Sequence, residues 1–344
     1  MKLRKLENLD VKNKKVFLRL DLNVPISGGK ISDETRIIGA LPTIRHLLDK
    51  EAKLVLCSHL GRPKDTYEAK YSLEPVASRL AELLKVEVLF VPDYTDGELV
   101  PMLDNLRQGQ LILLENLRFH PEETKNDLEF SARLARPFDF YVDDAFGAVH
   151  RAHASIVGVA ENIPKDRRAA GFLIEKEVNA LAPLLGQPKP PFVVIMGGAK
   201  VSDKITVILN LMERANTLLI GGAMAYTFLH YQGKKIGKSK IEADKMDLIE
   251  AIYKVAQQRH VEICLPIDHL GAEAFDAGAP AIKIKDQDIP DHLMGLDIGE
   301  KTIELFSRKI SAAATVLWNG PMGVFEWDQF AKGSEAIARA LSEA

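Results

Sequence analysis

Residues 15–25, KVFLRLDLNVP, decide the fold class of this chain. A short run of Val, Phe and Leu is typical of a buried strand, and Pro25 ends it because proline has no N–H for a sheet ladder. Asp21 and Asn23 are two residues apart, so in extended chain they project from the same face. Together they suit recognition of hydroxyl groups on a small polar ligand, or an Asx turn that closes the strand.

Similar apolar runs recur along the chain and alternate with helical patterns, which predicts βαβ units and mostly parallel sheets. Several runs are apolar at consecutive positions, as expected when helices cover both faces of a sheet. The expected strands are residues 16–20, 53–58, 86–91, 110–115, 138–143, 191–196, 217–221, 262–266 and 315–318. The expected helices are residues 35–50, 73–84, 127–134, 172–185, 204–214 and 242–259.

The length of 344 residues predicts two domains. KDRRAAG at 165–171 is followed by a helical pattern and by the Pro-rich GQPKPP at 186–191, so we place the boundary between residues 168 and 169. The intervening helix is either a semi-rigid hinge or an ordinary surface helix. We therefore expect an α/β fold of two Rossmann-like three-layer domains with mostly parallel sheets, joined by a hinge helix.

Composition narrows the class of protein. Hydrophobic residues make up 47% and charged residues 27%, the balance of a soluble globular chain. The 45 Lys and Arg nearly cancel the 48 Asp and Glu, so bulk charge does not suggest nucleic-acid binding. No apolar run reaches the length of a membrane span and no secretory signal is present, so we expect a cytoplasmic protein. Cys57 and Cys264 are expected to be buried free thiols rather than a disulfide or zinc site.

Cationic side chains follow the expected strands of the first half, in SHLGRP (58–63), ENLRFH (115–120) and DDAFGAVHRAH (143–153). Because the carboxyl ends of parallel strands share one edge, these side chains are expected to converge. Guanidinium groups match phosphate or carboxylate oxygens bidentately, which predicts a site for a small phosphorylated acid. The members of this predicted basic patch are Arg36, His59, Arg62, Arg118, His150 and Arg151.

A metal site built from the Asp and His residues of segment 143–153 is the rival hypothesis. It ranks below anion binding because neither an H-x₃-H nor an HExxH pattern supports it. Its members would be Asp143, Asp144, His150 and His153.

Glycine and lysine follow an expected strand of the second half, in GGAKVSDKI at 197–205. Glycines at a strand–helix junction let backbone N–H groups approach a phosphate. Lys200 and Lys204 share one face if the helix has begun by then. The sequence contains neither a P-loop nor a G-x-G-x-x-G fingerprint. WNGPMGVFEW at 318–327 supplies a rigid loop in which Glu326 is placed to accept hydrogen bonds from ribose hydroxyls.

Seven motifs resemble, in this order, those of the phosphoglycerate kinase family. They are KVFLRLDLNVP, SHLGRP, ENLRFH, DDAFGAVHRAH, GGAKVSDK, DIGEKT (297–302) and WNGPMGVFEW. The resemblance covers essentially the whole chain. It implies reversible phosphoryl transfer between 1,3-bisphosphoglycerate and ADP, giving 3-phosphoglycerate and ATP with Mg²⁺. It also implies a monomer whose domains close by a hinge, with 3-phosphoglycerate bound by residues 1–168 and the nucleotide by residues 169–344.

The resemblance also implies roles for individual residues. Asp21 and Asn23 would hold the glycerate end of the substrate, and Arg36 and Lys200 would stabilise the transferring phosphoryl group without a protein nucleophile. The substrate site would further include Leu60 and Gly61. The nucleotide would be bound by Gly198, Ala199, Lys200, Lys204, Gly222, Gly295, Asn319, Pro321 and Glu326.

The sequence departs from the family pattern at two places. After RALSEA (339–344) nothing matches the family's Gly-Gly-Gly-Asp loop, whose Asp helps to bind Mg-nucleotide, or its final segment. Residues 221–223 also have GGA where the family usually has three glycines. Two hypotheses follow: an active kinase, or a truncated or impaired form that binds 3-phosphoglycerate without efficient transfer.

Overall fold

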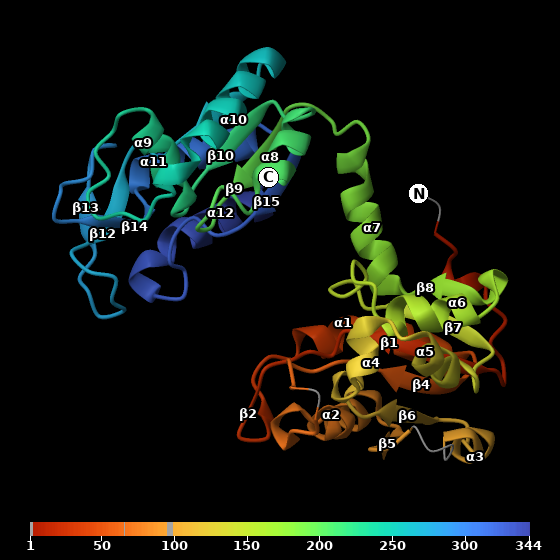
Figure 1. Ribbon diagram of the computed structural model, residues 1–344. Helices are drawn as coiled ribbons and strands as arrows, with labels where there is room; N and C mark the ends of the chain where they lie inside the picture. The colour runs from red at the N-terminus through yellow and green to blue at the C-terminus, as the bar shows by residue number, and fades with distance from the viewer. Residues whose placement is uncertain (1–2, 65, 95–98) are drawn as a thin grey trace. The chain divides into compact units, whose positions relative to one another are not determined.

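The computed structural model describes residues 3–64, 66–94 and 99–344. The chain forms two compact units, Met1–Ala182 and Pro183–Ala344 (Figure 1). Helix α7 (Phe172–Leu185) contains the point of division, and the boundary predicted at 168/169 lies just before this helix. The assignment of one ligand to each domain stays a prediction.

Unit 1 is built on a six-stranded sheet in which every pair of neighbours is parallel, in the order β5-β6-β4-β1-β7-β8. The chain leaves β1 toward β4 on one side and leaves β7 toward β8 on the other, so ligands are expected beyond the carboxyl ends of β1 and β7. The strands are β1 (Lys15–Leu20), β4 (Lys53–Cys57), β5 (Glu87–Val91), β6 (Gln110–Leu114), β7 (Phe140–Asp144) and β8 (Arg168–Ala170).

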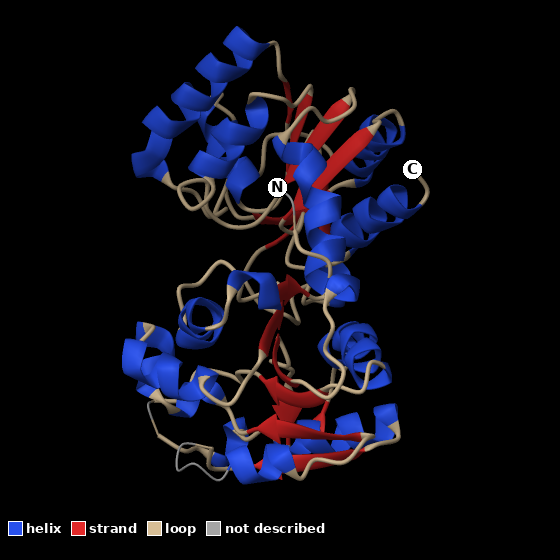
Figure 2. Cartoon of the chain, turned by 90° about the vertical axis from the view of Figure 1, so that its right-hand side faces the viewer, coloured by secondary structure: helices blue, strands red, loops and turns tan. Residues whose placement is uncertain are grey.

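Alternation along the strands of unit 1 divides its core into two layers, one on each face of the sheet. Leu18 packs with residues of α1 and α2, whereas Phe17 packs on the other face with residues of α3, α5 and α6. Figure 2 shows the strands of each unit with helices around them. The helices are α1 (Thr35–Asp49), α2 (Glu74–Leu84), α3 (Leu99–Asp104), α4 (Pro121–Lys125), α5 (Leu128–Ala135) and α6 (Val159–Asn162).

Unit 2 repeats this design with a parallel sheet in the order β11-β10-β9-β15. Its connections reverse at the β9/β15 pair, which is the expected place for a ligand. Residues of α8, α9 and α10 pack on one face, and residues of α11 and α12 on the other. The strands are β9 (Phe192–Met196), β10 (Thr217–Ile220), β11 (Glu262–Cys264) and β15 (Thr315–Asn319). The helices are α8 (Ile205–Met212), α9 (Met224–Tyr231), α10 (Met246–Arg259), α11 (Glu300–Ser311) and α12 (Lys332–Ser342).

Two further sheets were not predicted from the sequence. Unit 2 carries an antiparallel sheet in the order β13-β12-β14, made of β12 (His269–Ala272), β13 (Ile282–Ile284) and β14 (Met294–Ile298). A small hairpin pairs β2 (Ile26–Ser27) with β3 (Lys30–Ile31). The expectation of mostly parallel sheets is confirmed, and all nine expected strands are present with ends that differ by one or two residues.

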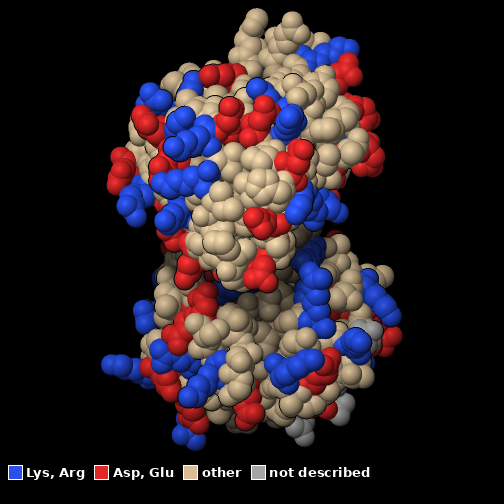
Figure 3. Space-filling view, turned by 90° about the vertical axis from the view of Figure 1, so that its left-hand side faces the viewer, with Lys and Arg blue, Asp and Glu red and all other residues tan. Residues whose placement is uncertain are grey.

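The surface and the thiols also agree with the composition. Figure 3 shows Lys and Arg interspersed with Asp and Glu over the visible face. Cys57 and Cys264 are free and buried, as predicted. Among residues 3–64, 66–94 and 99–344, no helix combines the length and the apolar composition needed to cross a bilayer.

The core of unit 2 gives a direct test of the fold. Leu218 lies on β10 and is fully buried, so Leu218→Ala is expected to lower the free energy of unfolding by about 2–5 kcal/mol. Val207 on α8 is 46% exposed, and Val207→Ala is expected to change the free energy of unfolding by less than about 0.5 kcal/mol. Urea unfolding followed by circular dichroism measures both, and equal losses would contradict the packing described here.

Candidate functional site

The loops that follow β1, β4 and β6 are tied together by side-chain hydrogen bonds to the backbone. Asn23 Oδ1 accepts a hydrogen bond from Gly61 N at 2.8 Å. Asn116 Oδ1 accepts one from Leu60 N at 3.1 Å, and its Nδ2 donates to Leu60 O at 2.7 Å. Arg118 Nη1 donates to Gly61 O at 2.6 Å. The loop at 58–63, which follows β4, is thus held by side chains of the loops that follow β1 and β6. This agrees with the predicted convergence of strand-end segments.

Asp21 pairs with a cation rather than standing free. Its Oδ2 accepts a hydrogen bond from Arg36 Nη1 at 2.5 Å, and its Oδ1 accepts one from Asn23 N at 3.2 Å. The second contact is the Asx turn that was the alternative to ligand recognition. Gly147 lies against this pair, because an added Cβ would stand 2.4 Å from Asp21 Oδ2. The structure therefore joins Arg36 to the loops after β1 and β7.

His59 is buried and faces a guanidinium group. Its Nδ1 lies 3.2 Å from Arg19 Nη2. Burial lowers the pKa of His59 to about 2, with further lowering by the charges of Arg19, Arg118, Arg151 and His153. Guanidinium is only a donor, so Nδ1 is the acceptor and the ring proton is on Nε2. His59 is a neutral imidazole.

Repulsion among the remaining cations shows how far the patch extends. Burial lowers the pKa of Arg118, and the charges of Arg151, Arg19 and Arg62 lower it further. These groups therefore lie within electrostatic range of one another. His150 is exposed and makes no hydrogen bond or ion pair within the described part of the chain, so nothing joins it to the other members.

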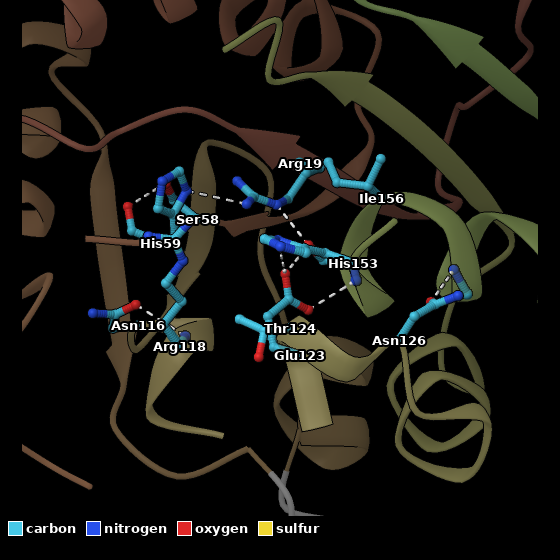
Figure 4. Close-up of polar contacts among 12 residues, drawn as sticks. Arg19, Ser58, His59, Asn116, Arg118, Glu123, Thr124, Asn126, His153 and Ile156 are labelled. Atoms are coloured by element: carbon cyan, nitrogen blue, oxygen red, sulfur yellow. Dashed lines mark hydrogen bonds and ion pairs between the residues drawn. The ribbon is translucent and has the colours of Figure 1, made fainter. Parts of the chain in front are cut away.

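Sequence reasoning missed a group of buried polar residues beneath this patch. Arg19, Glu123 and Ser155 are each 0% exposed. Figure 4 shows Arg19 between His59 on one side and the neighbourhood of Glu123 and His153 on the other. An arginine inside the apolar run of β1 is the signal that could have pointed to this group, because buried charges need partners.

The rival metal site finds no support in these contacts. Asp143 Oδ1 accepts a hydrogen bond from Ala145 N at 2.9 Å, and burial raises the pKa of Asp143 to about 6. Asp144 Oδ1 accepts one from Ile174 N at 3.0 Å, near the start of α7. Within the described residues, no group of three or more His, Cys, Asp and Glu is arranged to hold a metal ion.

Unit 2 contains a cleft of about 490 Å³ at the β9/β15 pair. Six residues of the predicted nucleotide site line it, namely Gly198, Ala199, Gly222, Gly295, Pro321 and Glu326. Gly222 has φ +65°, and an added Cβ would lie 2.5 Å from Gly198 N and 2.9 Å from Pro321 O. A side chain at this position would therefore separate the strand-end loops that form the cleft.

Three predicted residues are not among the described residues that line this cleft: Lys200, Lys204 and Asn319. Lys204 Nζ donates to Gly197 O at 2.7 Å and to Asn319 Oδ1 at 2.6 Å, which joins the loops after β9 and β15. Helix α8 begins only at Ile205, so the lysines do not share a helical face and that premise was wrong. Lys200 is exposed.

Other side chains of the cleft escaped sequence reasoning. Two are cations, Lys238 and Lys240, and two are aromatic, Tyr226 and Phe275. They come from α9 and from irregular segments, and no local pattern connects them with β9 or β15. Positive charge beside an aromatic wall suits a ligand with phosphates and a ring.

Two carboxylates, the buried one of Asp297 and the half-buried one of Glu242, hold backbone segments beside this cleft. Asp297 Oδ2 accepts a hydrogen bond from Gly333 N at 2.7 Å, and an added Cβ at Gly323 would lie 2.4 Å from its Oδ1. Burial raises the pKa of Asp297 to about 7. Glu242 accepts hydrogen bonds from Val201 N at 2.6 Å and Ser202 Oγ at 2.5 Å. The glycine-containing loops are therefore braced from outside the cleft.

Comparison with known proteins gives consistent matches over the whole chain. Residues 6–344 match the sequence model of the family described as phosphoglycerate kinase. A phosphoglycerate kinase of Clostridium tetani is 48% identical over 343 residues, which are 98% of this chain and 84% of the relative. One of Pseudothermotoga lettingae is 49% identical over 346 residues, 100% of this chain and 86% of the relative.

Solved structures agree with these matches. Phosphoglycerate kinase from Coxiella burnetii has a TM-score of 0.87 and 37% identity, covering 100% of this chain and 86% of that one. The enzyme from Pyrococcus horikoshii OT3 has a TM-score of 0.83 and 32% identity, covering 98% of this chain and 86% of that one.

The environment of His59 makes a testable prediction about pH. Its pKa lies below the ordinary value of 6.5, so the unfolded chain binds more protons between those two values and folding stability falls as the pH drops through this window. We expect the His59 ring to stay neutral from about pH 8 to about pH 5. A ¹H–¹⁵N NMR titration, with His59→Gln to assign the resonance, measures this, and a titration midpoint near 6.5 would refute it.

Proposed function

The chain belongs to the phosphoglycerate kinase family, and on that basis we propose that it catalyses phosphoryl transfer between 1,3-bisphosphoglycerate and ADP, giving 3-phosphoglycerate and ATP. The observation that carries the proposal is the match over residues 6–344, which spans both units. The two sites add chemical support. One gathers guanidinium and imidazole groups at a sheet edge, and the other is a cleft with lysines and aromatic rings at the edge of a second sheet.

We propose that 3-phosphoglycerate binds to unit 1. Arg62, Arg118 and Arg151 would meet its phosphate, because guanidinium forks match phosphate oxygens. His59 would donate a hydrogen bond from Nε2. Asp21 and Asn23 would meet the glycerate hydroxyl and carboxyl end, and their present contacts with Arg36 and Gly61 would then be shared with the ligand.

We propose that the nucleotide binds in the cleft of unit 2, with Glu326 on the ribose and Lys200 and Lys204 on the phosphates. Mg²⁺ prefers oxygen ligands and usually binds through phosphates, waters and one or two carboxylates. The cleft lining includes Lys238 and Lys240, and its carboxylate, Glu326, is assigned to the ribose, which fits a nucleotide whose phosphates supply the oxygen ligands of the ion. The ion would neutralise phosphate charge when bound. Monomeric state and a cytoplasmic location belong to the same proposal.

The chemistry asks for charge stabilisation rather than a covalent intermediate. Arg36 and Lys200 are the candidates for neutralising charge on the transferring phosphoryl group. Removal of one such preorganised donor typically costs about 10²–10³ in kcat. Both side chains are exposed, so each is accessible to a ligand.

A coupled assay with 3-phosphoglycerate and Mg-ATP tests the proposed activity. We expect turnover by this chain, with formation of ADP followed through NADH oxidation. Calorimetry with 3-phosphoglycerate accompanies the assay. Binding without turnover would contradict the kinase proposal and support the binding-only form instead.

Two substitutions separate the proposed roles. Arg36→Ala is expected to lower kcat about 10²-fold or more and to leave the Kd for ADP unchanged, because Arg36 would act on the transferring group. Lys204→Ala is the matched variant, and it is expected to weaken ADP binding about tenfold. Steady-state kinetics and calorimetry measure both. Equal losses of kcat and ADP affinity in Arg36→Ala would remove that residue from the role.

A further inference from the structure

A buried chain of polar groups runs from α4 to His59. Glu123 on α4 accepts a hydrogen bond from Ser155 N at its Oε2, 2.9 Å away, and one from Ser155 Oγ at its Oε1, 2.6 Å away. Arg19 Nε lies 2.7 Å from Ser155 Oγ, and Arg19 Nη2 lies 3.2 Å from His59 Nδ1. These contacts form one connected path (Figure 4).

The direction of each hydrogen bond in this path follows from the donors available. A serine hydroxyl has one proton, and here it goes to the Glu123 carboxylate, so Oγ can only accept from Arg19 Nε. The guanidinium has donors only, so its other end must donate to a lone pair on His59. Reversal of any one bond would leave two donors facing each other. Because the guanidinium donates from every nitrogen, Arg19 alone sets the direction of its bond to His59, and Glu123 and Ser155 act by holding the Nε end of Arg19 in place.

The path also has fixed geometry. Arg19, Glu123 and Ser155 are 0% exposed and His59 is 5% exposed, so water does not compete for these bonds. Arg19 Nη1 also donates to Leu20 O, which holds the guanidinium plane at a third point. On the neighbouring strands Arg19 stands opposite Cys57 and Asp143. Such a guanidinium cannot turn without breaking several buried contacts.

We propose that Glu123, acting through Ser155 and Arg19, is a positioning residue that holds His59 as the Nε2–H tautomer for hydrogen bonding to the anionic substrate. The inference rests on the proposed function for the identity of that substrate. The hydrogen bonds that connect Glu123 with His59 through Ser155 and Arg19 do not depend on the identity of the substrate. The Nε2–H of His59 would then be a neutral donor with a fixed orientation, beside the arginines proposed to meet the phosphate.

His153 is a second imidazole near the same carboxylate. Its Nδ1 lies 3.9 Å from Glu123 Oε1 and has no hydrogen-bond partner among the residues that the structure describes. Ser155 already takes up the closer contacts to Glu123. Glu123 therefore contacts Ser155, and through it Arg19, more closely than it contacts His153. The proposal predicts that removal of the Glu123 charge changes the tautomer of His59.

The tautomer of His59 is measured directly by long-range ¹H–¹⁵N NMR of the full chain labelled at histidine. In the unsubstituted protein we expect the Nε2–H pattern alone, and a mixture of tautomers would overturn the proposal. This measurement needs no variant to fold and no substrate to turn over. It therefore separates failure of the positioning role from failure of the proposed function.

Two variants test whether Glu123 controls this state. Glu123→Gln keeps the volume but places a donor against Ser155 Oγ, and Ser155→Ala removes the link. In both, the anchor of Arg19 Nε is weakened or lost, so Nη2 can move away from His59 Nδ1, and we expect a mixture of His59 tautomers. The KM for 3-phosphoglycerate should rise about tenfold, the loss of about one hydrogen bond to a charged group, and the KM for ATP should stay unchanged.

Matched controls exclude a general loss of structure or charge. Glu129→Gln makes the same chemical change at an exposed position of α5 and is expected to alter neither tautomer nor KM. Arg19→Lys keeps the charge but loses the fork, and it is expected to behave like Glu123→Gln. Folded Glu123→Gln and Ser155→Ala that keep the Nε2–H pattern and a KM within twofold would overturn the proposal.

Discussion

Parallel strand pairing is the constraint on which both sites depend. A parallel ladder requires the chain to cross over between neighbouring strands, so every strand of the two main sheets enters from the same end. The residues after those strands are thereby collected at one edge. Where the direction of the connections reverses, at β1/β7 in unit 1 and at β9/β15 in unit 2, the loops diverge and leave room for a ligand. The fold thus determines where chemistry can occur before any side chain is considered.

The side chains at these edges then meet a second constraint, which is that buried polar groups need partners. In unit 1 the requirement extends into the core, because Arg19 lies inside β1 and needs acceptors from Ser155, Leu20 and His59. In unit 2 the buried carboxylate of Asp297 accepts a hydrogen bond from Gly333 N in α12, and the half-buried Glu242 accepts one from Val201 N in the loop after β9. Polar groups beneath or beside the strand-end loops therefore help to hold these loops in both units.

Sequence reasoning succeeded where the signal is local. Strand cores and the polar residues directly after them are visible as short patterns, and the main strands and the convergence of loops 58–63 and 115–120 were predicted from them. It failed where the partners are distant in sequence. Arg19 and Ser155 are separated by 136 positions, and no local sequence pattern around either residue indicates that the two are in contact. The premise that Lys200 and Lys204 share a helical face was wrong, because α8 begins only at Ile205, and the residues around 197–205 carry no pattern that marks this start.

Two of the cations proposed to meet a ligand, Arg36 and Lys204, already have partners in the chain. Arg36 is held by Asp21, and Lys204 by Gly197 and Asn319. At Lys204, whose ammonium group already has acceptors in Gly197 and Asn319, a ligand would exchange one set of hydrogen bonds for another, so the net gain there would be smaller than the number of contacts suggests. His59 differs, because Arg19 occupies Nδ1 and leaves Nε2–H as the donor. His59 and Arg36, which uses only Nη1 for Asp21, could therefore each add a hydrogen bond to a ligand without giving one up.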